Sequence, residues 1–288
     1  MCYQLRKWIF EETYGYSIEQ LSAQAVAEIQ RDIINIRTSY QHDVCLKRYA
    51  TKAERNAYMI TYYPTYIAPI GAIFRGCLGK ELLRKRELHL TYYAGGPCPE
   101  LYGTLQVLRG MGYRGRIEAT IYDEQVGWEQ QQALTKKLCE KEHLLCRGDD
   151  LHAVFGCDNG RDCRRCTGWA TYCREESAKT DIFCLQNYLS HIREAREIIP
   201  ELKKKVSRAK QGAYFVICDL NYGTSRRILR KLASTCDDAD IVATNIQGAC
   251  EEIHCPYSAY GMEKIFTGAD KLIAKSWTRY YYLVLRRR

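Results

Sequence analysis

From residue 88 onward, short apolar runs alternate with segments long enough to form a helix. Such runs suit strands that helices cover on both faces, and a helix between two successive strands joins them in parallel. The alternation therefore predicts an α/β fold with a mostly parallel sheet, right-handed crossovers and helices on both faces. The runs that we assign to strands are Leu88–Tyr93, Ile117–Tyr122, Leu144–Cys146, Ile182–Leu185 and Ala213–Cys218.

The C-terminal region has a different pattern. Lys271–Trp277 and Arg279–Leu285 are two β-rich runs with only Thr278 between them. A crossover helix does not fit into this gap, so we expect the two runs to pair as an antiparallel hairpin at the end of the sheet.

The part of the chain before the first strand has a helical pattern. Ser17 with Gln20, and Thr51 with Glu54, each form a capping box in front of residues at helical spacing. The first helix should end near Arg37, Pro64 should end the second, and a third should follow Pro69. We therefore expect a helical N-terminal extension or lid at 1–87, a sheet domain at 88–288 and, within it, a cysteine-rich insertion at 151–180.

Charge and cysteine usage bear on location and partners. The formal charge of +9 favours an acidic partner, but 34 acidic residues dilute the 43 basic ones along the chain. No run of 18 or more apolar residues and no secretory signal pattern is present, which predicts a cytoplasmic protein without a membrane partner. In that reducing compartment the 15 cysteines stay as free thiols, bind metal or serve in a site.

The loops after the strands carry the polar groups of a candidate site, because ligands of open α/β sheets bind beyond the carboxyl ends of the strands. Residues 94–101 (AGGPCPEL) follow the first strand, and their small side chains let the backbone approach a ligand at a helix N-terminus. Asp123 and Glu124 follow the second strand, where carboxylates accept hydrogen bonds from ribose hydroxyls. With 148–151 (GDDL) and 186–188 (QNY) after the next two strands, the set suits a nucleoside-bearing ligand.

These motifs resemble those of class I S-adenosylmethionine-dependent methyltransferases. GGPCPEL is similar to their glycine loop, Tyr122-Asp123 to their ribose-binding acid, GDDL to their adenine-binding turn, and DIFCLQN to the fourth-strand motif that faces the transferred methyl group. The resemblance covers residues 88–288 and implies a Rossmann-like methyltransferase sheet, mostly parallel with an antiparallel C-terminal hairpin, and S-adenosylmethionine as cofactor. The cofactor-binding residues that it implies are Tyr92, Ala94, Gly95, Gly96, Pro97, Glu100, Asp123, Glu124, Asp150, Leu151, Gln186 and Asn187.

The glycine loop departs from the family pattern at three positions. Tyr92 stands at the place of an acid that contacts the methionine amino group, and Ala94 and Cys98 stand at the places of glycines. Glu100, at the start of the following helix, is the candidate that replaces the missing acid. A dinucleotide site is disfavoured because no G-x-G-x-x-G fingerprint is present and Pro97 removes an N–H group. Walker, H-E-x-x-H and G-x-S-x-G motifs are absent as well.

A second signal is a cluster of cysteines, spaced C-x5-C-x2-C-x6-C, between the third and fourth strands. Four thiolates so close together suit one tetrahedral zinc ion, and an iron–sulfur cluster is the less favoured alternative, because the segment shows no hydrophobic shell. Ordinary or redox-active thiols remain the other interpretation. Arginines interleave with these cysteines and with Trp169 and Tyr172, which suits RNA contact. The candidate metal ligands are Cys157, Cys163, Cys166 and Cys173.

The expected function is methyl transfer from S-adenosylmethionine to an unidentified acceptor, which is a small molecule, a protein or RNA. The protein's main task in such a reaction is to align donor and acceptor. Asn187, Tyr188 and Asp219 are the candidates for catalytic residues on the acceptor side, although Asp219 could instead cap the next helix with Ser225 nearby. The alternative is a non-catalytic, methyltransferase-like module that binds RNA or protein through a metal-binding insertion.

Overall fold

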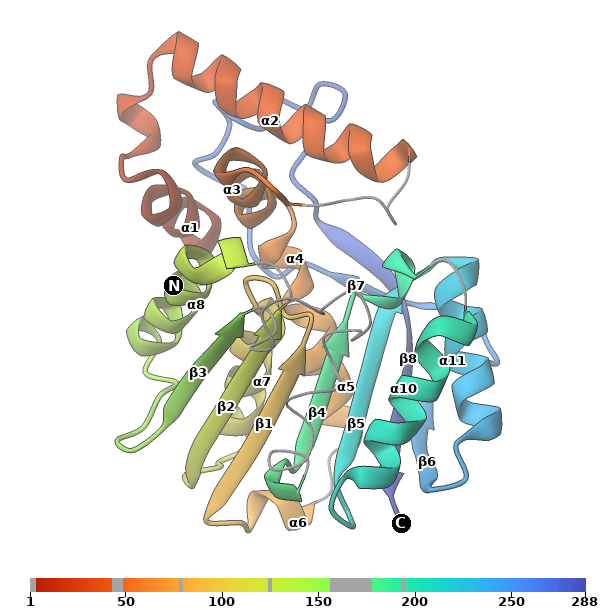
Figure 1. Cartoon of the computed structure of the whole chain (residues 1–288). Coiled ribbons are helices and arrows are strands. Elements are labelled where there is room, and N and C mark those ends of the chain that lie inside the picture. Colours follow the sequence, from red (N-terminus) through yellow and green to blue (C-terminus); the bar gives the residue numbers. More distant parts are fainter. Residues whose placement is uncertain (1–3, 43–48, 78–79, 124–125, 156–177, 193–194) are drawn as a thin grey trace.

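The structure, a computed structural model, describes residues 4–42, 49–77, 80–123, 126–155, 178–192 and 195–288. Within these ranges eight strands form one sheet, in the order β3-β2-β1-β4-β5-β8-β6, with β7 paired to β8 (Figure 1). The strands are β1 (Glu87–Tyr93), β2 (Arg116–Asp123), β3 (Asp150–Phe155), β4 (Ile182–Gln186), β5 (Tyr214–Leu220), β6 (Ala239–Thr244), β7 (Glu251–His254) and β8 (Trp277–Arg287).

The pairing of the strands confirms the predicted fold class. Strands β1 to β5 run parallel to one another, so their carboxyl ends meet at one edge of the sheet. Strand β8 is antiparallel to β5, β6 and β7. The result is a Rossmann-like sheet that is mostly parallel and has an antiparallel strand from the C-terminus inserted near one end.

The predicted third strand is wrong. Leu144–Cys146 lies in the loop after helix α8 (Glu129–Lys141), where the N–H of Leu144 donates to the carbonyl of Cys139 and its own carbonyl accepts from Arg109. The apolar side chains of Leu144 and Leu145 thus pack at a helix end. The strand that pairs with β2 starts later, at Asp150. Its polar start, with an exposed His152, lacks the apolar pattern that identified the other strands.

The predicted C-terminal hairpin is also wrong. The residues of 271–276 form no strand, and the single strand β8 begins at Trp277. Lys271 has a left-handed backbone, with φ of 61°, and Thr278, expected in the turn, is a buried strand residue. The antiparallel partners of β8 come from earlier in the chain and are not signalled by local spacing.

The N-terminal block is helical, as predicted, but its boundaries differ. The Thr51–Glu54 capping box is confirmed: the Thr51 hydroxyl accepts from the N–H of Glu54 at 3.2 Å, and the N–H of Thr51 donates to the Glu54 carboxylate at 3.0 Å. The Ser17 box caps only a short 3-10 turn, and the long helix starts at Ala23. Pro64 lies in the first turn of a new helix, where its missing N–H costs no hydrogen bond.

The helices surround the sheet in layers (Figure 1). Helices α5 and α7 cover one face, and α10 and α11 cover the other. Of the N-terminal helices, α1 to α4 lie over the carboxyl ends of the strands, and α6 lies at the opposite end. The helices and 3-10 turns are α1 (Leu5–Tyr14), η2 (Ile18–Gln20), α2 (Ala23–His42), α3 (Lys52–Thr61), α4 (Tyr63–Tyr66), α5 (Ala68–Cys77), α6 (Lys80–Leu83), α7 (Pro99–Gly110), η4 (Val126–Trp128), α8 (Glu129–Lys141), η5 (Leu189–His191), α10 (Ala195–Arg208) and α11 (Gly223–Thr235).

The N-terminal helices share a hydrophobic core with the sheet. Ile33 of α2 and Phe74 of α5 are fully buried in the same cluster as Leu105 of α7 and Ile117 of β2. A second cluster fills the space under α10 and α11. The helical block is therefore held over the strand ends by continuous apolar packing. None of the helices in the described ranges has the length and apolar character needed to cross a bilayer.

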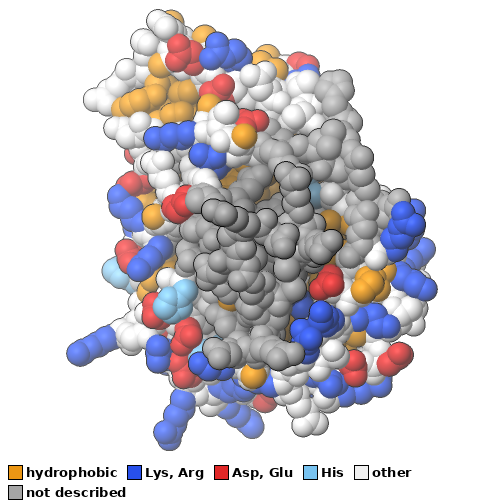
Figure 2. All heavy atoms as spheres, in the orientation of Figure 1, with side chains coloured by type: hydrophobic (Ala, Val, Ile, Leu, Met, Phe, Trp, Pro, Cys, Tyr) orange, Lys and Arg blue, Asp and Glu red, His pale blue; other side chains and the backbone are white. Residues whose placement is uncertain are grey.

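Basic side chains gather over α10 and α11 on the face drawn in Figure 2. Lys204 of α10 and Arg227 of α11 are exposed, as expected for solvated helix faces. Lys205 is an exception, because it is buried and its ammonium lies 4.4 Å from the ring centroid of Tyr93. Lys204 thus faces solvent, whereas Lys205 takes part in the packing of α10 on the sheet.

Candidate active site

The turn after β1 has an unusual backbone. Ala94, Gly96 and Cys98 all have left-handed conformations, with φ of 50°, 52° and 56°. Ala94 and Cys98 are not glycines, so each adopts this conformation at a cost of about 1 kcal/mol. A side chain at Gly95 would force Ile121 to shift, because a Cβ atom there would lie 2.7 Å from the Ile121 side chain. The turn brings its backbone close to the end of β2.

Asp123, at the end of β2, holds this turn in place. Its carboxylate accepts a hydrogen bond of 2.7 Å from the N–H of Gly96. On the other side, Gln132 of α8 donates to the carbonyl of Gly96 at 2.7 Å, and Thr135 donates to the carbonyl of Pro97 at 2.5 Å. The glycine turn, the ribose-binding candidate and α8 therefore form one hydrogen-bonded unit.

A cavity of about 240 Å³ lies at the carboxyl edge of the sheet. It sits where the strand order reverses between β1 and β4, the position at which open α/β sheets bind ligands. The predicted site residues that line it are Ala94, Gly95, Gly96, Pro97, Glu100, Asp123, Gln186, Asn187 and Tyr188. Most of the predicted cofactor loop and the first two acceptor-side candidates are thus brought together.

Other predicted residues lie elsewhere. Tyr92 is fully buried within β1 and does not line the cavity. Asp219 is also fully buried and accepts from the Ser225 hydroxyl at 2.8 Å and the N–H of Ser190 at 3.3 Å. This carboxylate ties η5 to α11 through Ser190 and Ser225, but it does not cap α11, because the start of that helix has no side-chain cap hydrogen bond. Glu124 and the cysteines Cys157, Cys163, Cys166 and Cys173 fall outside the described residues.

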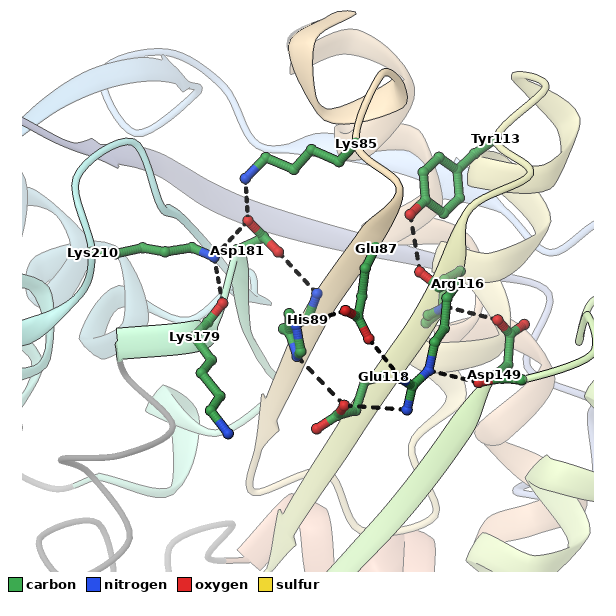
Figure 3. A network of polar contacts seen from close by, with 12 residues as sticks. Lys85, Glu87, His89, Tyr113, Arg116, Glu118, Asp149, Lys179, Asp181 and Lys210 are labelled. Atoms are coloured by element: carbon green, nitrogen blue, oxygen red, sulfur yellow. Dashed lines mark hydrogen bonds and ion pairs between the residues drawn. The ribbon is translucent and has the colours of Figure 1, made fainter.

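The GDDL turn lies at the opposite edge of the sheet, which corrects the assignment of Asp150 and Leu151 to the cofactor site. Both residues begin β3 instead of following the third strand. Figure 3 shows Asp149 at this amino edge. Its carboxylate pairs with Arg109 at 2.5 Å and accepts from the N–H of Ile117 at 2.7 Å. The turn therefore fastens α7 and β2 and does not reach the cavity.

Figure 3 also shows a group of acidic and imidazole side chains near that edge. Ligand atoms of Glu87, His89 and Glu118 lie within 4.8 Å of one another. Arg116 already pairs with both carboxylates, at 3.1 Å and 3.6 Å. The positive charge of the guanidinium occupies the place where a cation would bind, so we assign no metal there.

Glu100 is a buried acid in the cavity wall. It is 3% exposed, in the first turn of α7, and burial raises its pKa from 4.5 to about 8. Its own N–H and the Cys98 thiol hydrogen-bond the carboxyl group, but no lysine or arginine of the described ranges pairs with it. Nearby Asp123 raises the pKa further. A carboxyl group in this setting is ready to bind a cationic group of a ligand.

An aromatic roof over the cavity was missed by sequence reasoning. Tyr58 and Tyr66 come from α3 and α4, and Trp128 comes from the turn before α8. The Tyr58 and Trp128 ring centroids are 5.6 Å apart. Burial raises the pKa of both tyrosines well above 10, so their hydroxyls stay protonated. The residues of the aromatic roof are Tyr40, Tyr49, Tyr58, Tyr66 and Trp128.

The end of β4 connects this roof to the sheet. Gln186 donates from its side-chain amide to the carbonyl of Tyr66 at 2.8 Å. The next residue, Asn187, has a left-handed backbone with φ of 56°, which turns the chain back into the cavity wall. Tyr188 and His191 follow in the same wall. Side chains from the strand end and from the helical block thus enclose one space.

No protein-family model matches this chain, and no curated protein matches it at a significant level. Several solved structures are similar to it in fold. One, described as a putative class I S-adenosylmethionine-dependent methyltransferase from Listeria monocytogenes, is 11% identical, with a TM-score of 0.49 and coverage of 98% of this chain and 87% of that one. An rRNA methylase from Streptococcus thermophilus is 7% identical, with a TM-score of 0.37 and coverage of 75% and 93%.

A phosphoethanolamine N-methyltransferase from Haemonchus contortus, in complex with phosphoethanolamine and S-adenosylhomocysteine, is 11% identical to this chain. Its TM-score is 0.45, and the match covers 81% of this chain and 44% of that one. Likenesses at these identities concern the fold alone. The function of this chain therefore has to be inferred from the residues around its own cavity.

Proposed function

We propose that this chain is an S-adenosylmethionine-dependent methyltransferase whose cofactor binds in the cavity at the carboxyl ends of β1, β2 and β4. The observation that carries the proposal is the unit formed by the glycine turn and Asp123, with the 2.7 Å hydrogen bond between Gly96 and the carboxylate. It lies at the point where the strand order reverses. The left-handed backbone at Ala94 and Cys98 supports the same assignment, because the turn keeps its shape without two of its glycines.

The residues of the cavity fit the chemical groups of this cofactor. Asp123 is placed to accept from ribose hydroxyls, and Glu100 offers a carboxyl group without a cationic partner to the methionine ammonium. Gly95 and Gly96 line the cavity, and the missing side chain of Gly95 makes room for Ile121, so the turn packs tightly against the end of β2. When bound, the cofactor supplies a methyl group on a positively charged sulfur atom.

The protein's own contribution is alignment and exclusion of water. The aromatic roof closes the cavity with apolar ring faces, and such faces also attract a positive charge. Asn187 and Tyr188 stand at the β4 end of the cavity, where they orient the acceptor. Asp219 acts behind them as a positioning residue, because it bonds η5 from a fully buried place.

Calorimetric titration with S-adenosylhomocysteine tests this proposal. Asp123→Asn should weaken binding by at least about tenfold, since a ribose hydroxyl loses a charged acceptor worth roughly 1.5–3 kcal/mol. Asp240→Asn, on the exposed strand β6, is the matched control and should bind like the unchanged protein. Equal affinity of the Asp123 variant, or no binding at millimolar ligand, would contradict the proposal. Binding without methyl transfer to any acceptor would favour the non-catalytic module.

A further inference from the structure

Two cations lie close together beside the cavity. Lys275, in the loop before β8, has its ammonium 5.7 Å from the ring centroid of Tyr66 and 6.0 Å from that of Tyr62. Burial, and then the charge of Arg37, lower the pKa of Lys275 to about 8. Arg37 comes from α2 and donates to the carbonyl of Ile273 in the same loop. The fold therefore holds two like charges near each other in a partly buried place.

Neither cation has the partners that such a place normally requires. In the part of the chain that the structure describes, no carboxylate forms an ion pair with Arg37 or Lys275. Asp270 acts on Arg37 only at longer range. The Nε atom of Arg37 is buried without an acceptor. Within the described ranges the Lys275 ammonium makes no hydrogen bond and lies beside the rings of Tyr62, Tyr66 and Trp277 instead. Both side chains are partly buried, and an anion between them would offset the repulsion of the two like charges.

This pair of cations adjoins the proposed active site. The Tyr66 ring lines the cavity and also lies beside Lys275. Tyr62 stacks on Tyr66, with ring centroids 5.8 Å apart and an interplanar angle of 9°. An anion held by Arg37 and Lys275 would therefore be separated from the cavity by little more than one aromatic ring.

Two exposed aromatic residues flank the same region. Trp277 is 45% exposed, and its ring lies 5.9 Å from the ammonium of Lys275. Tyr222 is 41% exposed and follows β5, whose end is joined to β8 by a 3.0 Å hydrogen bond from the N–H of Asn221 to the carbonyl of Arg279. Large exposed rings beside unpaired cations are typical of surfaces on which bases stack while their phosphates are neutralised.

We propose that Arg37 and Lys275 bind a phosphate group of the methyl acceptor, with its base stacked on Trp277 or Tyr222, so that the acceptor is a nucleotide unit. This inference rests on the proposed methyltransferase function. Arginine suits phosphate because its planar guanidinium donates two parallel hydrogen bonds, and lysine adds a point charge. The phosphate belongs either to a free nucleotide or to an RNA chain, and the two sources are separated by the test.

The test measures binding of uridine 5′-monophosphate, uridine and hexauridylate in the presence of saturating S-adenosylhomocysteine, which keeps the probes out of the cofactor cavity. Uridine 5′-monophosphate or hexauridylate should bind, and uridine should bind at least tenfold more weakly than its phosphate. Binding of hexauridylate alone assigns the phosphate to a polymer. Arg37→Gln and Lys275→Gln should each weaken binding of the phosphorylated probe about tenfold or more. The control Lys204→Gln, at an exposed position of α10, should leave the affinity for this probe unchanged.

The affinity for S-adenosylhomocysteine separates this inference from the proposed function. All three glutamine variants should keep it unchanged, which also shows that they fold. If S-adenosylhomocysteine binds but neither phosphorylated probe does, the acceptor inference fails and the cofactor site stands. If a phosphorylated probe binds in the absence of any S-adenosylhomocysteine binding, the proposed function fails instead. Equal binding of the phosphorylated probe by the Lys275 variant and the unchanged protein overturns the phosphate site.

Discussion

Replacement of Glu100 by glutamine should make the stability of the protein less dependent on pH. In the folded chain the pKa of Glu100 is raised to about 8, mainly by burial, from an ordinary value of 4.5. Well below pH 4.5 the carboxyl group is protonated in both the folded and the unfolded chain, so it does not change the free energy of unfolding. As the pH rises toward 8, the unfolded chain loses the proton first, so the folded state becomes progressively less stable.

The magnitude follows from the size of this shift. At pH 7 the raised pKa of Glu100 lowers the free energy of unfolding by on the order of 3 kcal/mol, and this loss reaches its full value of about 4–5 kcal/mol above pH 8. Glu100→Gln removes the ionisation, so the variant should be close to the unchanged protein in stability at pH 5 and more stable by a few kcal/mol at pH 8.5. The measurement is denaturant unfolding at both pH values.

The control for this experiment is Glu140→Gln, an exposed glutamate on α8. This variant and the unchanged protein should show the same change in the free energy of unfolding between pH 5 and pH 8.5. The same glutamine at position 100 should weaken S-adenosylhomocysteine binding, because the ligand ammonium loses its carboxylate. Binding to the unchanged protein at pH 7 should release close to one proton, visible as a dependence of the calorimetric heat on the buffer. An identical pH dependence for the Glu100 variant and the unchanged protein would refute the reasoning.

Further substitutions test the packing and the metal expectation. Arg6→Leu should destabilise the fold by about 3 kcal/mol or more in denaturant unfolding, because a buried arginine that bonds α3 and the segment between β7 and β8 is lost, whereas exposed Arg31→Leu should have little effect. Gly95→Ala should cost about 1–3 kcal/mol in the same assay, since its Cβ atom would meet Ile121, while Gly110→Ala has open space and should be neutral or stabilising. Elemental analysis of protein purified without oxygen should find close to one zinc ion per chain, lost on substitution to serine of any of Cys157, Cys163, Cys166 and Cys173.

The sequence predicted the parts of the fold that depend on local pattern. Buried strands such as β1 and β4 show as apolar runs, and the glycine turn and Asp123 follow such strands directly. Strand β3 was misplaced because it begins with polar residues at the side of the sheet, next to a more apolar loop. The partners of β8 come from distant segments, so nothing in the spacing near Trp277 reveals them.

The roof of the cavity could not be predicted for a related reason. Tyr58, Tyr62 and Tyr66 recur at a spacing of four, a signal of one helical face, but this spacing does not say which surface the face covers. Only the packing of α3 and α4 above the strand ends brings them over the glycine turn. The role of Asp219 was ambiguous for the same reason, since its bond to Ser190 depends on the fold of η5.

A crystal structure of the protein soaked with S-adenosylhomocysteine tests the central claim most directly. The ligand should lie in the cavity at the carboxyl ends of β1, β2 and β4, with its ribose hydroxyls within hydrogen-bond distance of Asp123 and its ammonium facing Glu100. Ligand density at another place, or a cavity that stays free of ligand in crystals where S-adenosylhomocysteine is present at millimolar concentration, would contradict the account.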